Sequence, residues 1–449
     1  MQWKIWTTGV LAIGLTMADT AQAEAIWQSV RPLNRPDTAL PDTLTDPVSL
    51  ISVAARPKLR PATKAVTDTA KVEVVASPAG FDRWVTGFKR RARAQGISAG
   101  TLDAAFRNVS YDADVIRRDR NQSEFTKTIW DYLGSAASAT RIANGRIALK
   151  NHNSTLTAIE KRYGVEKEVV VAVWGLESAY GTFRGKNDVV TSLATLSFDG
   201  RRGAFFEEQL IAALKILQNG DTSPRKMTGS WAGAMGHTQF IPTSYLSYAV
   251  DFDGDGRRDI WAENPVDALA STAAYLKKSG WTKGQPWGVE VRIPKGFDYT
   301  LADRKIRKSP GQWARLGVVD MNGRAVPDHG RASVLLPAGA QGAAFLIFDN
   351  FKAIEAYNSA DAYVIGVGHL SDRIKGGPAI RASWPTDDRA LTRAEREEMQ
   401  RRLTGKGFST QGIDGRIGPK TIDAVRSYQR AQGIVPDGYA SLTLLKRLR

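Results

Sequence analysis

The sequence predicts a mainly α-helical protein with a small β insertion and a separate C-terminal helical unit. Three observations support this fold class. Apolar residues recur every three or four positions over long stretches, beginning with Phe81, Trp84 and Phe88, as is typical of amphipathic helices. Short alternating runs bounded by Gly and Pro replace this pattern over residues 287–351. An acidic junction at Asp387-Asp388 then precedes a small last unit.

The first 23 residues have the features of an export signal. Lys4 precedes an apolar run from Ile5 to Met17, and Ala21-Gln22-Ala23 forms a small-residue cleavage site. A membrane anchor is the alternative, but the run is shorter than the roughly 20 residues that a spanning helix needs. We therefore expect cleavage after Ala23, no stable membrane insertion afterwards, and a periplasmic location.

Residues 24–80 are predicted to form a disordered tether. Seven prolines occur between Arg31 and Gly80, with many Thr and Ala residues and no aromatic side chain. Such a segment cannot bury enough apolar surface to offset the entropy that it loses on ordering.

Composition and charge narrow the classes of function. Lys and Arg number 62 against 46 Asp and Glu, a net charge of +16, which favours anionic polymers as partners. Export, and the lack of a recognition helix or zinc pattern, argue against nucleic acid as the partner.

The residue content excludes several chemistries. The absence of Cys excludes disulfides, thiolate metal sites and a Cys nucleophile. The four His residues lack zinc-ligand spacing and Ser178 has no evident His and Asp partners, so a zinc peptidase or a serine hydrolase is disfavoured.

Two folded units follow the tether. Residues 81–388 should form one domain, and residues 389–449, with 13 basic and 6 acidic side chains, should form a binding module too small for a catalytic cleft. Helices are expected in the larger domain over residues 81–138, 148–163, 205–217 and 266–276. Strands are expected at Val289–Ile293, Val334–Leu336 and Ala344–Phe348. The last unit should have helices near Arg393–Leu403, Lys420–Gln432 and after Pro436-Asp437-Gly438.

The stretch from Glu166 to Gly181 is the most informative one. Eight uncharged residues, Val169–Leu176, precede Glu177, a run too continuous for a single apolar face. A buried strand is one interpretation, but the length of the run and Gly181 as a stop favour a buried helix. Burial raises the pKa of a carboxyl group, which suits a proton donor near neutral pH. A structural Glu that pairs with an Arg or reaches solvent is the alternative.

Residues 230–245 combine small residues with polar and aromatic groups. The Gly and Ala residues at 232–236 would let a backbone approach a ligand closely, and they would equally permit close helix packing. Gln239 offers an amide for sugar hydroxyl and acetamido groups, and Phe240 offers a ring on which a sugar can stack.

Three motifs in this order resemble those of the lytic murein transglycosylases of the membrane-bound lytic transglycosylase B family. They are Glu-Ser-x-Tyr-Gly from Glu177, Ala-Gly-Ala-Met-Gly-x-x-Gln-Phe from Ala232, and Tyr-Asn-Ser-Ala-Asp-Ala-Tyr from Tyr357. The resemblance covers residues 81–377 and implies a lysozyme-like helical core with added α and β subdomains. The chain end, through Asp414-Gly415-x-x-Gly418-Pro419-x-Thr421, resembles the three-helix peptidoglycan-binding domain.

The resemblance implies cleavage of the β-1,4 bond between N-acetylmuramic acid and N-acetylglucosamine, leaving 1,6-anhydromuramic acid ends, without a cofactor. Glu177 would be the single acid and base, whereas most glycosidases use two carboxylates. A lysozyme-type hydrolase and a non-catalytic wall-binding scaffold are the alternatives. The last motif departs from the family in having Ala360 where Ser is frequent. The positions that match glycan-binding residues of the family are Ser230, Gln239, Phe240, Tyr275, Tyr357, Asn358 and Tyr363.

An aspartate-rich loop begins at Asp251. Carboxylates at loop positions 1, 3, 5 and 9, with Gly at position 6, fit the start of an EF-hand calcium loop, but position 12 is Ala262. The resemblance implies that Asp267 supplies the late carboxylate. Alternatively, Asp267 caps a helix that starts at Ala268, and hydrogen bonds alone hold the loop. The candidate ligands of a structural Ca²⁺ are Asp251, Asp253, Asp255, Arg257 through its backbone carbonyl, and Asp267.

Overall fold

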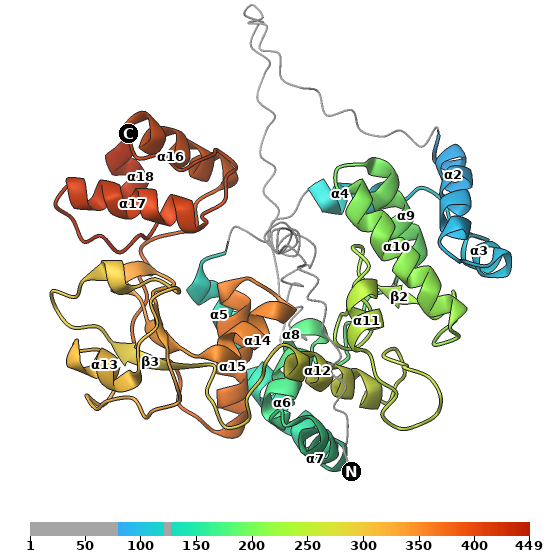
Figure 1. Ribbon diagram of the computed structural model, residues 1–449, viewed down its shortest axis with the longest axis horizontal. Coiled ribbons are helices and arrows are strands. Elements are labelled where there is room, and N and C mark those ends of the chain that lie inside the picture. The colour runs from blue at the N-terminus through green and yellow to red at the C-terminus, as the bar shows by residue number, and fades with distance from the viewer. Residues whose placement is uncertain (1–79, 121–126) are drawn as a thin grey trace, which may run out of the picture.

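The computed structural model describes residues 80–120 and 127–449 (Figure 1). The predicted export signal, residues 1–23, and all but the last residue of the predicted tether, residues 24–80, lie outside the described residues. In the two described ranges, no helix combines the length and the apolar character needed to cross a membrane.

Helix α8 (Lys167–Ser178) lies at the centre of the helical core, and residues 169–175 are all buried. A helix that is apolar on every face needs neighbours on every side. Those neighbours are α6 (Ala139–Asn151), α7 (Asn153–Tyr163), α12 (Val266–Lys278) and α15 (Asp361–Lys375). The helix predicted from residues 166–181 is therefore confirmed, and so is its burial.

A second helical region lies beside this core (Figure 1). Helices α9 (Val189–Asp199) and α10 (Gly203–Gln218) pack against each other. Asp119, only 2% exposed, accepts hydrogen bonds from the guanidinium groups of Arg201 and Arg202 and so ties α4 to the α9–α10 connection. The other helices before the β insertion are α2 (Phe81–Ala94), α3 (Ala99–Ala105), α4 (Ala113–Arg120), α5 (Ile129–Ala136), which packs on α15, and α11 (Pro242–Tyr248).

The β insertion is a four-stranded antiparallel sheet of order β4-β3-β6-β5. Leu346 of β6 pairs with Val289 of β3 on one side and with Val334 of β5 on the other. Trp313 from α13 (Pro310–Arg315) is fully buried in a small core of its own under this sheet. Three strands lie within a residue of their predicted positions, at β3 (Gly288–Arg292), β5 (Ser333–Leu335) and β6 (Ala344–Ile347). The short edge strand β4 (Val319–Asp320) was not predicted.

The C-terminal unit has three helices, α16 (Arg393–Gly405), α17 (Pro419–Ala431) and α18 (Leu442–Leu448), around a separate core. It lies against the β insertion (Figure 1). The backbone N–H of Ala340 donates to Asp437 at 2.9 Å, and the Arg426 guanidinium donates to the Ala302 carbonyl at 2.6 Å. The unit is therefore docked on the β insertion as well as joined to it by the chain.

Candidate active site

Glu177 is the second-last residue of α8 and is half-buried. The helix ends because Ala179, Tyr180 and Gly181 adopt φ angles of 48°, 59° and 87°, in the left-handed region that costs energy for residues with a Cβ. The sequence predicted that Gly181 would end the helix, whereas the helix ends at Ser178. The reason is tertiary: the Tyr180 hydroxyl donates to the Arg141 carbonyl of α6 at 2.7 Å and holds the tight turn.

Two tyrosines lie beside the Glu177 carboxylate. The Tyr363 hydroxyl of α15 donates to Glu177 Oε1 at 2.7 Å. Tyr132 of α5 is buried, and burial raises the pKa of its hydroxyl, with the negative charge of Glu177 adding to the effect. The carboxylate therefore lies where α5, α8 and α15 meet. Tyr132 was missed by sequence reasoning because nothing in its local pattern distinguishes it from a packing residue.

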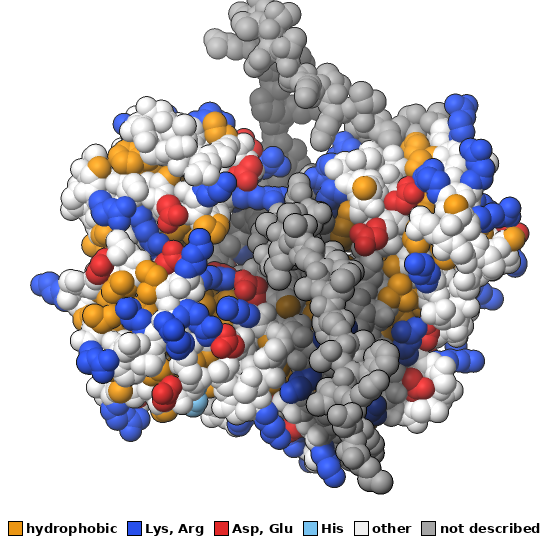
Figure 2. Space-filling view, in the orientation of Figure 1, with side chains coloured by type: hydrophobic (Ala, Val, Ile, Leu, Met, Phe, Trp, Pro, Cys, Tyr) orange, Lys and Arg blue, Asp and Glu red, His pale blue; other side chains and the backbone are white. Residues whose placement is uncertain are grey.

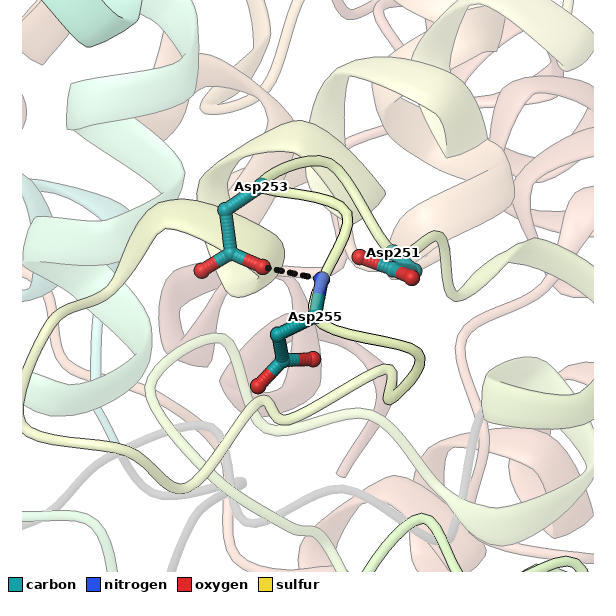
Figure 3. A group of neighbouring side chains, drawn as sticks. All are labelled: Asp251, Asp253 and Asp255. Atoms are coloured by element: carbon teal, nitrogen blue, oxygen red, sulfur yellow. Dashed lines mark hydrogen bonds between the residues drawn. The ribbon is translucent and has the colours of Figure 1, made fainter.

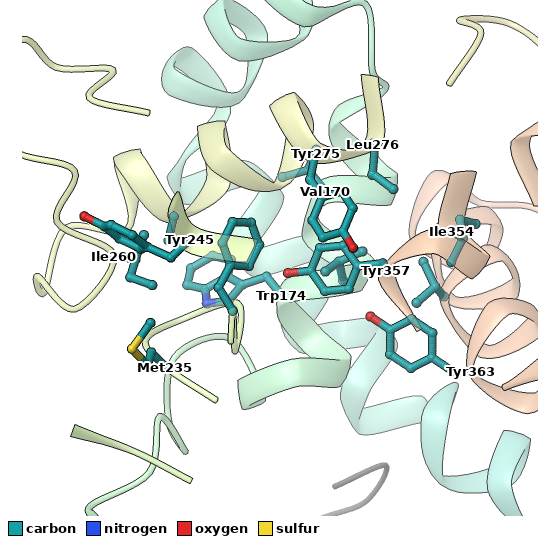
Figure 4. Packing of buried hydrophobic residues seen from close by; sticks show 14 of the residues in the cluster. Val170, Trp174, Met235, Tyr245, Ile260, Tyr275, Leu276, Ile354, Tyr357 and Tyr363 are labelled. Atoms are coloured by element: carbon teal, nitrogen blue, oxygen red, sulfur yellow. The ribbon is translucent and has the colours of Figure 1, made fainter. Parts of the chain in front are cut away.

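Four tyrosines form a row that ends at Glu177, and Figure 4 shows three of them, Tyr275, Tyr357 and Tyr363. The Tyr248 and Tyr275 rings stack at 3.9 Å between centroids. Tyr357 is 4.8 Å from Tyr275, and Tyr363 stacks on Tyr357 at 6.4 Å. The hydroxyls of Tyr275 and Tyr357 donate to backbone carbonyls, each at 2.6 Å, which fixes the orientation of the rings. We call Tyr248, Tyr275, Tyr357 and Tyr363 the tyrosine row; the sequence predicted three of its members and missed Tyr248.

Phe240 is fully buried beneath this row. Its ring packs edge-on against Tyr275 and at a steep angle against Tyr357, with both centroids at 5.7 Å. The expectation that this ring offers a sugar a free face is therefore wrong. The backbones of Met235 and Phe240 are bridged, and the residues around them are apolar. The Phe240 ring is therefore buried in the core, where it supports the tyrosines.

The side chains at the remaining predicted positions form hydrogen bonds with backbone groups. Ser230 accepts backbone hydrogen bonds from Ala232 and Ala234 through its hydroxyl oxygen, and so shapes its own turn. The Gln239 side-chain amide donates to the carbonyls of Arg184 and Gly236 at 3.0 and 2.8 Å. Asn358 accepts from the Ala360 N–H and remains half-buried.

The aspartate loop gathers three of its five predicted ligands. Asp251, Asp253 and Asp255 offer carboxylate oxygens within 4.8 Å of one another (Figure 3), and such a set of hard oxygen donors fits Ca²⁺. Asp267 lies outside this group and is 2% exposed. The backbone donates to its two oxygens from Phe252 at 2.8 Å and from Asp259 at 2.9 Å.

The alternative expectation for Asp267, that it caps the following helix, is wrong. Helix α12 starts at Val266 with Pro265 at the capping position. Burial raises the pKa of Asp267 to about 6, and the nearby charges of Asp253 and Asp251 contribute to this shift. The Asp267 carboxylate therefore links the start of the loop, at Phe252, to its end, at Asp259, and does not cap a helix. The backbone carbonyl of Arg257 stays a predicted ligand.

A shallow depression of about 750 Å³ lies elsewhere, between α10 and α11. Its lining does not include Glu177 or the tyrosine row; it includes Gln95, Glu207, Ile211, Lys215 and Leu246. Lys and Arg side chains are spread over the face seen in Figure 2 rather than gathered in one patch.

Comparison with known families matches most of the folded chain. Residues 80–372 match the transglycosylase SLT domain, and residues 392–448 match the peptidoglycan binding domain. The chain belongs to the transglycosylase SLT family. The mainly helical, lysozyme-like fold with a β insertion and a C-terminal binding domain, expected from the sequence, is thereby confirmed.

Solved structures of SLT-family proteins have the same architecture. SltB3 from Pseudomonas aeruginosa, in complex with NAG-anhNAM-pentapeptide, is 50% identical with a TM-score of 0.80 over 82% of this chain and 99% of that one. The Escherichia coli lytic transglycosylase Slt35, in complex with calcium, is 28% identical with a TM-score of 0.56 over 67% of this chain and 94% of that one.

A curated SLT-family relative is membrane-bound lytic murein transglycosylase B of Escherichia coli (strain K12). It is 34% identical over 240 residues, or 52% of this chain. The match spans 63% of the length of that relative.

Proposed function

We propose that this SLT-family chain is a lytic transglycosylase of peptidoglycan, with Glu177 as its only acid and base. The observation that carries the proposal is the position of Glu177, which is half-buried at the end of the tyrosine row and accepts a hydrogen bond from Tyr363. The complexes of SltB3 with NAG-anhNAM-pentapeptide and NAG-NAM-pentapeptide support this substrate class.

The reaction needs two proton transfers at one carboxyl group. Protonated Glu177 donates its proton to the glycosidic oxygen as the bond from that oxygen to C1 of N-acetylmuramic acid breaks. The acetamido group of the substrate stabilises the positive charge at C1. Ionised Glu177 then removes the proton of the C6 hydroxyl, and O6 bonds to C1. No water is consumed, and the product is a 1,6-anhydromuramic acid end.

Tyr363 assists the first transfer. A hydrogen bond donated to a carboxylate stabilises its ionised form, and ionised Glu177 is the form produced when its proton passes to the glycosidic oxygen. The fixed hydroxyl also orients the carboxylate, because Tyr363 is itself packed against Tyr357.

The walls of the glycan groove are assigned to the residues around this carboxylate. Tyr275 and Tyr357 are only 4% and 3% exposed, so together with Phe240 they form the aromatic layer that supports the groove. The polar wall consists of Ser230, Gln239 and Asn358. Sugar hydroxyls bind in such grooves to fixed polar groups.

The aspartate loop holds a structural Ca²⁺ in this proposal. Asp251, Asp253 and Asp255 supply the clustered carboxylates, and the ion would neutralise their mutual repulsion. The calcium complex of Slt35 supports this assignment. The ion takes no part in the cleavage.

Location and retention follow from the two ends of the chain. Residues 1–23 direct export, and the cleaved protein acts in the periplasm. The domain at residues 389–449 holds the enzyme on its insoluble substrate, and the match of residues 392–448 to a peptidoglycan binding domain supports this role. Its net charge of +7, from 13 basic and 6 acidic side chains, favours anionic wall peptides.

The mass of the products tests the proposed function. Purified sacculi digested with the protein should release anhydro-disaccharide peptides, which are lighter than hydrolytic products by one water. Products of hydrolytic mass would instead identify a lysozyme-type hydrolase. Glu177→Gln should abolish release while binding to sacculi remains, and an unchanged release would identify a scaffold whose Glu177 is structural.

A further inference from the structure

His237 connects the active-site turn to the segment that follows the aspartate loop. It lies between β2 (Thr228–Gly229) and α11 and is 4% exposed. Its backbone N–H donates to the Ile260 carbonyl at 3.1 Å, and its ring reaches the Ala262 carbonyl at 2.7 Å. His237 is not one of the positions that the sequence motifs singled out.

The partners of the ring define its protonation state. The indole Nε1 of Trp174 on α8 lies 3.2 Å from His237 Nδ1, and an indole nitrogen can only donate. Nδ1 must therefore accept, which leaves the proton on Nε2 to donate to the Ala262 carbonyl. The imidazole is neutral in this arrangement.

The same residue holds the turn that follows Glu177. The Ser178 hydroxyl donates to the His237 carbonyl at 2.5 Å and accepts from the Gly181 N–H at 3.0 Å. A Cβ on Gly181 would lie 2.6 Å from His237 Nδ1, so the ring rests directly on the turn backbone. Any shift of His237 is thus transmitted to the residues next to Glu177.

Arg184 completes the contact with the 260–263 segment. Its guanidinium donates to the carbonyls of Trp261 at 2.9 Å and Ala262 at 3.2 Å, and to the Glu263 carboxylate at 2.5 Å. Its Nη1 also lies 3.3 Å from His237 Nε2, farther than the 2.7 Å between Nε2 and the Ala262 carbonyl, which can only accept. The charged or titratable side chains near the imidazole are Arg184, Glu263 and His152. Burial lowers the pKa of His237, the hydrogen bond to Ala262 opposes that change, and Arg184 lowers the pKa further.

We propose that neutral His237 is a positioning residue for Glu177. His237 acts as a clamp that holds the turn at residues 178–181 against the segment at residues 260–263. The proposal deepens the proposed function and rests on Glu177 being the acid and base. If the imidazole gains a proton, Nδ1–H faces the indole N–H, and two donors cannot bond to each other. The clamp should then open, and cleavage should slow on the acid side of the pH profile.

Three substitutions and one control separate positioning from mere packing. His237→Asn keeps an acceptor near the Nδ1 position, His237→Gln keeps a donor near the Nε2 position, and His237→Ala keeps neither. Activity on soluble glycan strands should lose about 100-fold in kcat for His237→Ala, as expected for a misplaced catalytic group, and less for the other two, with KM nearly unchanged. His329→Asn, on the β insertion, serves as the control and should behave as wild type.

The pH profile provides the readout that packing alone would not move. His237→Asn cannot gain a proton, so the acid-side fall in its kcat should move to lower pH than in wild type. A profile that is scaled down without this displacement would overturn the proposal, as would unchanged kcat in His237→Ala.

A spectroscopic measurement tests the clamp independently of catalysis. The chain has four His residues, so ¹⁵N-histidine NMR gives few signals, and the one missing from His237→Asn belongs to His237. It should show the neutral Nε2–H tautomer at pH 7. The Nδ1–H tautomer or a charged ring would overturn the proposal. Wild-type protein that gives no anhydro product, with this signal as expected, would instead mean that the proposed function has failed.

Discussion

The Tyr363 hydroxyl donates a 2.7 Å hydrogen bond to Oε1 of Glu177, joining two helices whose contacting residues are 186 positions apart in sequence. A hydrogen bond to a charged group contributes more than one between neutral groups. The bond therefore stabilises ionised Glu177 relative to its protonated form. It also means that the environment of Glu177 is assembled only when α8 and α15 have packed together.

Tyr363→Phe tests this relationship with little change in shape. Loss of the hydrogen bond should lower kcat about 10- to 100-fold, because ionised Glu177 becomes harder to form, and should leave KM nearly unchanged. Tyr357→Phe is the matched control, since its hydroxyl bonds to the Thr238 carbonyl instead and its loss should affect stability more than kcat. Equal losses of kcat in the two variants would contradict the role given to Tyr363.

Much of the fold was predictable because periodicity is local. The uncharged run before Glu177 was long enough to indicate a buried helix, and the alternating Val289-Glu290-Val291 run indicated a strand. The exact end of α8 was not predictable. It depends on Tyr180 reaching Arg141, 39 residues away, and on Ser178 reaching His237, 59 residues away.

The candidate site was predictable only where motifs carried it. Glu177 and Tyr363 came from motifs, and they do lie in contact. Tyr132 and Tyr248 carry no local signal, because each reaches the site through the packing of its helix. Phe240 shows the opposite error: a motif position was assigned to ligand contact, whereas the apolar environment draws its ring fully into the core.

Gly175→Ala should disturb the helix beneath Glu177. A Cβ there would lie 2.6 Å from Cζ of Tyr180, a rigid ring that cannot bend aside, so the turn after Glu177 must shift. Overpacking of this kind costs about 1–3 kcal/mol, and we expect a lower melting temperature together with lower kcat. Gly134→Ala in α5 is the matched control, because nothing lies within 4 Å of its added Cβ, and it should stabilise by about 0.5–1 kcal/mol. A Gly175→Ala protein as stable as wild type would contradict this packing.

Calcium should stabilise the protein through the aspartate loop. An ion that binds only the folded state at 100 times its dissociation constant adds about 2.7 kcal/mol, so the melting temperature should rise with CaCl₂ and fall back with chelator. Asp253→Asn combined with Asp255→Asn should remove this response, and both side chains are exposed, so folding should survive. Equal stabilisation by Ca²⁺ in wild type and variant would place the ion elsewhere.

Asp372 should make stability depend on pH. Burial raises the pKa of this carboxyl from 3.8 to about 6, against the opposing hydrogen bond from Trp287. The folded protein therefore holds this proton more tightly than the unfolded chain, so the contribution is greatest below pH 3.8 and is lost as the pH rises through about 6. Asp372→Asn keeps an acceptor for Trp287 and should stabilise by about 2–3 kcal/mol at pH 8, with little effect at pH 3.5. Thermal unfolding at the two pH values checks this; equal effects at both would contradict it.

Deletion of residues 389–449 should separate retention from catalysis. The domain buries its own core, and its docking contacts, Asp437 with Ala340 and Arg426 with Ala302, lie on the β insertion and not at Glu177. Binding to sacculi should therefore fall by about 100-fold or more as the second attachment point is lost, while cleavage of short soluble glycans changes little. Arg426→Ala is the matched control for docking alone, and it should leave sacculus binding nearly intact. If the deletion lowers soluble cleavage as much as sacculus binding, the domain must take part in forming the catalytic groove, and the division of labour proposed for the two units is wrong.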